Sequence, residues 1–207
     1  MTTTLLTHLE LPSGVRVWFS ADHHFGHANI IRYADRPYPH VDAMDSDIIR
    51  RDNAVVAPTD VFFALGDLCL GSFDASLACA AGLNGIKFLM PGNHDRVSVA
   101  GRNKPAYIEK FRARYEAAGY TVLPEEGVTI DLHGVRLALS HYPYQGDHTE
   151  RDRHLEFRPK DEGLPLLHGH IHGERRIDGR MFNVGVDVND FTPVSEEQVL
   201  EFAKAAA

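Results

Sequence analysis

Aspartate, histidine and asparagine side chains recur in five short blocks of this sequence, and together they have the chemistry of metal ligands. In chain order the blocks are Asp22-x-His24, Gly66-Asp67, Gly92-Asn93-His94-Asp95, His141 and Gly169-His170-x-His172. Carboxylate, imidazole and amide oxygen together suit divalent ions such as Mn²⁺, Fe²⁺ or Zn²⁺. Because no cysteine lies in any block, a structural thiolate zinc site is disfavoured.

Each block follows a segment that is predicted to be a buried β-strand. The apolar runs are residues 15–20, 60–65, 86–90, 135–140 and 164–167, and continuous runs of this kind are typical of strands covered on both faces. The carboxyl ends of strands in open α/β sheets converge where ligands bind, so we expect the blocks to lie together. The i, i+2 spacing within the first and last blocks predicts two side chains on the same side of an extended segment.

Helical patterns alternate with these strands and predict an α/β fold. They cover residues 41–55, 73–81 and 105–118, and a last helix is predicted after Ser195, which forms a capping box with Gln198. A hairpin turn at His133-Gly134 predicts that the sheet is mixed. No repeat or linker is evident, so residues 1–207 are expected to form a single domain.

The ordered blocks resemble the calcineurin-like metallophosphoesterase superfamily and match all five of its signature blocks. The extended first block, Asp22 to Ile31 with Arg36-Pro37 after it, is similar to a compact bacterial and phage branch of that superfamily. The resemblance implies a four-layer α/β sandwich with mixed sheets that holds two divalent metal ions. One ion would be bound by Asp22, His24, Asp67 and His172, and the other by Asp67, Asn93, His141 and His170.

The same resemblance implies a reaction. Two ions about 3.5–4 Å apart clamp a phosphoryl group and lower the pKa of a shared water, so a metal-bridging hydroxide attacks phosphorus. His94 is then the candidate acid or transition-state stabiliser, and Asp95 is expected to orient its ring. His27 is expected to face the substrate phosphate. His168 is expected to form a hydrogen bond behind the ligands.

The expected function is therefore a metal-dependent phosphoesterase with a small substrate, and phosphodiesters are favoured over monoesters by analogy with short members of the superfamily. A phosphomonoesterase is one alternative. A nuclease for small substrates is another, because basic residues of the polar connection 142–163 could hold one or two nucleotides. An inactive binding or scaffold module is disfavoured, since such a protein is expected to lack a ligand or the residue at His94.

The composition of the chain limits the kinds of partner and compartment that are expected. The 207 residues carry 21 Lys and Arg against 29 Asp and Glu, a net charge of −8, which argues against an extended nucleic-acid footprint. No apolar run approaches the roughly 18 residues of a membrane helix. Residues 1–11 have no export or transit signal, so the expected compartment is the cytoplasm. Cys69 and Cys79 are expected to be free thiols. The native metal and the oligomeric state stay open.

Overall fold

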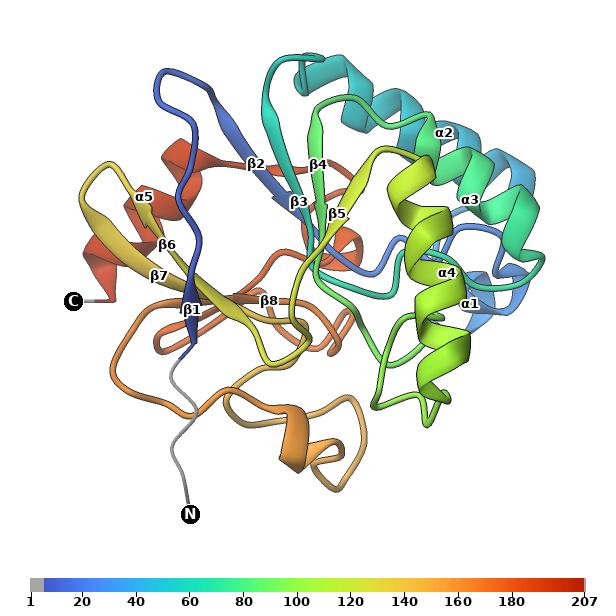
Figure 1. The fold of residues 1–207 in the computed structure, drawn as a ribbon. Helices are drawn as coiled ribbons and strands as arrows, with labels where there is room; N and C mark the ends of the chain where they lie inside the picture. The colour runs from blue at the N-terminus through green and yellow to red at the C-terminus, as the bar shows by residue number, and fades with distance from the viewer. Residues whose placement is uncertain (1–5, 207) are drawn as a thin grey trace.

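The computed structural model describes residues 6–206, so the expectation for the N-terminal residues lies partly outside the described range. Two mixed β-sheets form the centre of the molecule, and α1 to α4 lie together on one side of them, apart from α5 (Figure 1). The predicted α/β class is confirmed. Within the described residues, no helix is both long enough and apolar enough to cross a membrane.

One sheet has five strands. Their order is β11 (Val194–Ser195), β2 (Val17–Ser20), β3 (Val61–Ala64), β4 (Ile86–Leu89) and β5 (Tyr120–Val122). Neighbours from β2 to β5 are parallel, and β11 is antiparallel to β2. Every residue of β2 and β3 is buried, as the continuous apolar runs predict for strands covered on both faces.

The second sheet has six strands. Their order is β1 (Thr7–His8), β6 (Val128–Leu132), β7 (Val135–Leu139), β8 (Leu166–His168), β10 (Met181–Asn183) and β9 (Ile177–Asp178). The predicted hairpin joins β6 to β7 in antiparallel register. His133 and Gly134 both have positive φ, 49° and 83°, as a two-residue hairpin turn of the primed type requires.

Within residues 6–206, five α-helices connect or follow these strands. They are α1 (Ala28–Tyr33), α2 (Val41–Val55), α3 (Phe73–Ala81), α4 (Pro105–Ala117) and α5 (Glu196–Ala205). The predicted bounds of α2 and α3 are confirmed, and α4 ends one residue earlier than predicted. The capping box of Ser195 and Gln198 is present. No sequence pattern indicated α1 or the short strands β1, β5, β9, β10 and β11.

The layers differ from the expected sandwich in one respect. Helices α1 to α4 bury the outer face of the five-stranded sheet, with Ile48 and Phe111 in the same core cluster as Phe62. A second core joins the inner faces of the two sheets and includes Phe202 of α5. The outer face of the six-stranded sheet carries a small cluster covered by Tyr144 and by other non-helical residues. Three of the four expected layers are therefore present. On the outer face of the six-stranded sheet, residues of the connection 142–163, which has no helical periodicity, take the place of the fourth layer.

Candidate metal centre

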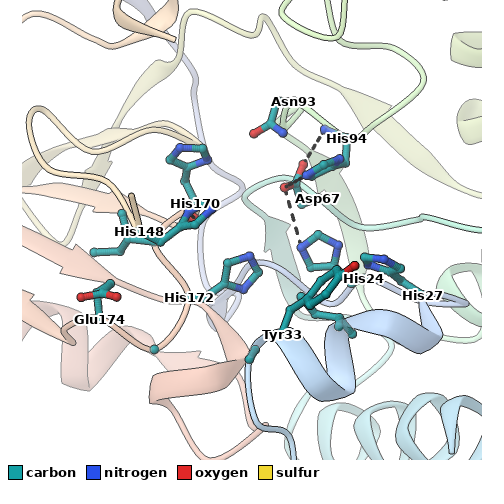
Figure 2. A pocket seen from close by; sticks show the side chains of 14 residues that line it. His24, His27, Tyr33, Asp67, Asn93, His94, His148, His170, His172 and Glu174 are labelled. Atoms are coloured by element: carbon teal, nitrogen blue, oxygen red, sulfur yellow. Dashed lines mark hydrogen bonds and ion pairs between the residues drawn. The ribbon is translucent and has the colours of Figure 1, made fainter. Parts of the chain in front are cut away.

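The five blocks meet in one place, where the carboxyl ends of strands from both sheets face each other. Strands β2, β3 and β4 of the five-stranded sheet lead into the first three blocks, and β7 and β8 of the other sheet lead into the last two. A cavity of about 460 Å³ opens there. Figure 2 shows His24, His27 and Tyr33 on one side of it and His148 and Glu174 on the other. The predicted convergence is confirmed.

The local backbone is not the extended one that the sequence suggested. Five of the candidate ligands have left-handed φ values: Asp22 58°, His24 53°, Asp67 52°, His170 74° and His172 47°. The extended geometry expected for the first and last blocks was therefore wrong, because the ligands lie on turns after the strands have ended, although Asp22 and His24 still face the same cluster. Non-glycine residues in this region cost of order 1–3 kcal/mol each and cluster at functional sites. Holding these five residues in the left-handed region therefore lowers the stability of the fold, and it turns their side chains toward the cavity.

Glycines in the blocks leave room for the ligands. A Cβ atom on Gly66 would lie 2.7 Å from Cγ of His141, and one on Gly92 would lie 2.5 Å from the backbone nitrogen of Asp67. A Cβ atom on Gly169 would lie 2.5 Å from Oδ2 of Asp22. Each distance is shorter than a van der Waals contact, so only glycine allows the ligands to approach this closely.

Asp67 lies at the centre of the cluster. Its Oδ2 atom is 3.5 Å from Nε2 of His141, 3.7 Å from Nε2 of His24 and 4.0 Å from Nε2 of His94. Its Oδ1 atom accepts a hydrogen bond from the backbone N–H of His94 at 2.8 Å (Figure 2). Burial alone would raise the pKa of this carboxyl, but the surrounding imidazoles of His141, His94 and His24 hold the pKa below its ordinary value. Asp67 is therefore a carboxylate at neutral pH.

Asp22 connects the two sheets beside Asp67. Its Oδ2 atom accepts the backbone N–H of His170 at 2.9 Å. Ligand atoms of Asp22, His24 and His172 lie within 4.8 Å of one another, and so do those of Asp22, Asp67 and His141. The two clusters share Asp22, and Asp67 is within 3.7 Å of His24 of the first cluster. Each of the two clusters could hold a divalent ion.

Unpartnered buried atoms test whether these residues suit metal ions. Within residues 6–206, the buried side-chain atoms without a hydrogen-bond partner include Asp22 Oδ1, both ring nitrogens of His24, Asn93 Oδ1 and His141 Nε2. Leaving a buried polar group without a partner costs about 1–3 kcal/mol. These five atoms all belong to candidate ligands, whereas the six other unpartnered atoms in the described range are on residues outside the ligand set, such as Asp45 and Asp52. The donor set therefore fits divalent ions that would take the missing partners' place.

Burial also keeps imidazoles in the neutral form that binds metal. It lowers the pKa of His24 well below its ordinary value and that of His170 to about 2. Burial opposes protonation of His172 as well, but the hydrogen bond that its ring donates to Asp187 and the nearby carboxylate of Asp22 raise the pKa of His172. An ion at His172 would therefore compete with a proton.

Three of the candidate imidazoles have one ring nitrogen bonded to an oxygen on the side away from the cavity. His141 Nδ1 lies 2.8 Å from the carbonyl oxygen of Leu65, His172 Nδ1 lies 2.9 Å from Asp187 Oδ2, and His170 Nε2 lies 3.2 Å from Asp147 Oδ2. Sequence reasoning missed both aspartates. Asp147 lies in the connection 142–163, which was singled out by its length and polarity, but nothing in the sequence pointed to Asp187.

Asp95 does not orient the ring of His94 as expected. Its carboxylate accepts the backbone N–H groups of Asp67, Leu68 and Gly92 at 2.8, 3.1 and 2.9 Å, and the hydroxyl of Tyr115 at 3.1 Å. In the described part of the chain, no hydrogen bond or ion pair joins it to the His94 ring. Burial raises the pKa of Asp95 to about 6. Asp95 thus fixes the turn that carries Asp67.

The other singled-out histidines have different surroundings. The His94 side chain is 48% exposed, and its ring centroid lies 5.6 Å from that of His24. His27 also lines the cavity, with its ring centroid 5.5 Å from that of His24. His168 is buried, and its Nδ1 atom is bonded to the carbonyl oxygen of Gly169 at 2.8 Å. His168 thus forms a hydrogen bond with the backbone beside His170.

Sequence comparison finds relatives that match this chain over most of their length. No family model matches the sequence. It is 34% identical to the gene 66 protein of Mycobacterium phage D29 over 190 residues, which cover 87% of this chain and 92% of the relative. It is 30% identical to the gene 66 protein of Mycobacterium phage L5 over 182 residues, or 82% and 86% of the two chains.

A solved structure has a similar fold. The crystal structure of a protein of unknown function from Aquifex aeolicus superposes with a TM-score of 0.68 and 26% sequence identity, over 91% of this chain and 99% of that one. The phage relatives match nearly the whole of both chains at 30% identity or more. This chain belongs to the family of the mycobacteriophage gene 66 proteins.

Proposed function

We propose that this chain is a two-metal hydrolase of small phosphate esters, and that phosphodiesters are its preferred substrates. The observation that carries the proposal is the set of buried carboxylate, imidazole and amide groups around Asp67, which include unpartnered atoms and of which His24, Asp67 and Asn93 line the cavity. The five sequence blocks support assignment to the calcineurin-like metallophosphoesterase superfamily.

The proposed ligand sets follow the same blocks. Asp22, His24, Asp67 and His172 would hold one ion, and Asp67, Asn93, His141 and His170 would hold the other. Mn²⁺, Fe²⁺ and Zn²⁺ all suit this mixture of oxygen and nitrogen ligands. When bound, such a pair supplies Lewis acidity to a phosphoryl group and lowers the pKa of coordinated water.

His94 is the proposed proton donor. It follows Asn93 directly, its backbone N–H is bonded to Asp67, and its half-exposed ring faces the cavity (Figure 2). A protonated Nε2 at this position would neutralise the oxygen of the departing alkoxide as it leaves phosphorus. His27, on the same side of the cavity, is placed to contact a substrate phosphate.

The charges of the cavity bear on the choice between a diester and a monoester. Among the described residues that line it, none is a lysine or an arginine, and Glu174 lies at one end. A phosphodiester carries one negative charge and a monoester carries about two at neutral pH. Apart from the proposed ions, the lining offers no cation to balance the second charge, so the side chains of the cavity add no preference for the dianion.

Two of the basic residues behind the nuclease alternative already have a partner. Arg153 and Arg158 of the connection 142–163 are paired with Asp147, at 3.0 and 3.3 Å, so these two guanidiniums are already engaged. A strand of nucleic acid with several phosphates would find few partners beside the cavity. The scaffold alternative is disfavoured because every candidate ligand and His94 are present.

Hydrolysis of two artificial substrates tests the proposal. With Mn²⁺ added, we expect bis(p-nitrophenyl) phosphate to be hydrolysed faster than p-nitrophenyl phosphate at equal concentration. His94→Ala should lower the rate by about 10²–10⁴-fold while its metal content stays unchanged. His133→Ala, in the exposed hairpin turn, is the control. Absence of hydrolysis with Mn²⁺, Fe²⁺ and Zn²⁺ would refute the proposal, and a monoester preference above about tenfold would reverse the substrate order.

A further inference from the structure

We infer that Asp147 and Asp187 are positioning residues, each of which holds the imidazole of one metal position from the side away from the cavity. Asp187 acts on His172, and Asp147 acts on His170 from the connection between β7 and β8. Both roles rest on the two-metal site of the proposed function, but not on the reaction that occurs there.

Asp187 is held in place by Arg36. It lies in the 3-10 helix η2 (Val186–Val188), and its side chain is 3% exposed. One oxygen accepts Nε of Arg36 at 2.7 Å, while the other accepts Nη2 of Arg36 at 3.0 Å and Nδ1 of His172 at 2.9 Å. Arg36 also donates to the backbone oxygens of Asp22 and His23 at 2.7 and 2.9 Å. One guanidinium thus ties Asp187 to the turn that carries Asp22.

Asp147 reaches the site from a distant part of the chain. Its side chain is completely buried, although the connection around it is largely exposed. Its carboxylate accepts hydrogen bonds from Nε2 of His170 at 3.2 Å and from the backbone N–H of Arg153 at 3.0 Å. It also forms ion pairs with the guanidiniums of Arg153 and Arg158. The connection therefore folds back on itself through Asp147 and contacts a candidate ligand with the same carboxylate.

These bonds determine which ring nitrogen can face an ion. A neutral imidazole that donates one N–H has its lone pair on the other nitrogen. Asp187 therefore leaves Nε2 of His172 as the ligand atom, and Asp147 leaves Nδ1 of His170. Carboxylates in this position fix the tautomer and the orientation of metal-binding histidines, and their loss typically weakens metal binding about 10–100-fold.

Asp147 has a second possible interpretation, as a direct ligand. Its carboxylate, His148 and His170 have atoms within 4.8 Å of one another and form a third cluster that could hold an ion. The guanidiniums of Arg153 and Arg158 contact the same carboxylate and would repel a cation there. The contacts of Asp147 therefore favour the positioning role.

The experiment measures metal content and affinity after loading with Mn²⁺, in Asp147→Asn, Asp187→Asn and wild type. We expect wild type to bind two ions per chain, and each variant to keep one and to bind the other about 10–100-fold more weakly. Asp152→Asn and Asp190→Asn remove the same charge from more exposed neighbours and should leave both ions in place. Equal unfolding curves in chelator would show that the variants fold.

A second set of variants assigns each carboxylate to its own position. In a His172→Ala background, Asp187→Asn should change nothing further, whereas Asp147→Asn should weaken the remaining ion. If Asp187→Asn does not fold, Arg36→Lys loosens the same carboxylate and should weaken the same ion. For Asp147, Arg153→Lys serves this purpose.

The outcomes separate this inference from the proposed function. Unchanged binding of both ions in Asp147→Asn and Asp187→Asn overturns the positioning roles, and three ions in wild type assign Asp147 as a ligand instead. Two ions in wild type with no hydrolysis of any ester overturn the proposed function and leave the positioning roles intact. Absence of metal binding in wild type overturns both.

Discussion

Replacing Gly66 with alanine should damage both stability and metal binding, because two separate costs meet at this residue. Gly66 has φ +92°, and a left-handed backbone costs an alanine about 1–2 kcal/mol. The added Cβ would also lie 2.7 Å from Cγ of His141 and 2.8 Å from Cα of Gly92. Overpacking of this kind costs about 1–3 kcal/mol, so the sum is about 2–5 kcal/mol.

Gly134 provides the matched control. Its φ of +83° is similar, but no atom lies within 4 Å of the Cβ position. Gly134→Ala should therefore lose only the backbone part, about 1–2 kcal/mol, and the difference between the two variants isolates the crowding of His141. Urea unfolding in the presence of a chelator measures this difference without a contribution from bound ions.

The metal arm of the same experiment examines His141 directly. Movement of its ring would disturb the bond between Nδ1 and the Leu65 carbonyl and would displace Nε2 from Asp67. Gly66→Ala should therefore bind one Mn²⁺ ion more weakly, and Gly134→Ala should bind both normally. Equal losses of stability in the two variants, together with equal metal content, would refute the reasoning.

Three further predictions follow from the same contacts. Burial raises the pKa of Asp45 from 3.8 to about 6, so its ionisation opposes folding and the stability of the protein falls as pH rises through that window. Asp45→Asn should therefore be more stable than wild type at pH 7 by at most ~3 kcal/mol. An advantage that is equally large at pH 4 would contradict this cause. Adding Mn²⁺ at a hundred times its Kd should raise the free energy of unfolding by ~2.7 kcal/mol for each site, and thermal melts should show a smaller increase for His172→Ala. Ser195→Ala removes one half of the capping box of α5 and should cost about 0.5–2 kcal/mol in urea unfolding, with metal content as the property that must not change.

The sequence was informative where the signal was local or repeated. Strands β2 and β3 were predicted because both of their faces are buried, so every position is apolar or small. The bounds of α2 and α3 and the cap of α5 followed from helical spacing and from Ser195 with Gln198. The gathering of the ligands followed from their place after strands, which needs no knowledge of side-chain direction.

What could not be predicted depends on backbone direction after the strands end. Nothing in the sequence indicates that Asp22, His24 and Asp67 have positive φ, because tertiary contacts hold these turns in place. For the same reason Asp95 was assigned to the ring of His94, although its partners include the backbone N–H groups of Asp67 and Leu68 in the turn after the neighbouring strand β3. Asp187 lies on a short irregular segment, where no periodicity indicates a partner.

The division of the ligands between the two sheets has a consequence for how ions would enter and leave. Asp22, His24, Asp67 and Asn93 follow strands of one sheet, and His141, His170 and His172 follow strands of the other. Parting the sheets at this edge would separate the ligands of both proposed positions, but an ion would not need this opening to leave, because the cavity already reaches His24, Asp67 and Asn93. Bound ions would therefore hold the two sheets together at this edge, and they would exchange through the cavity.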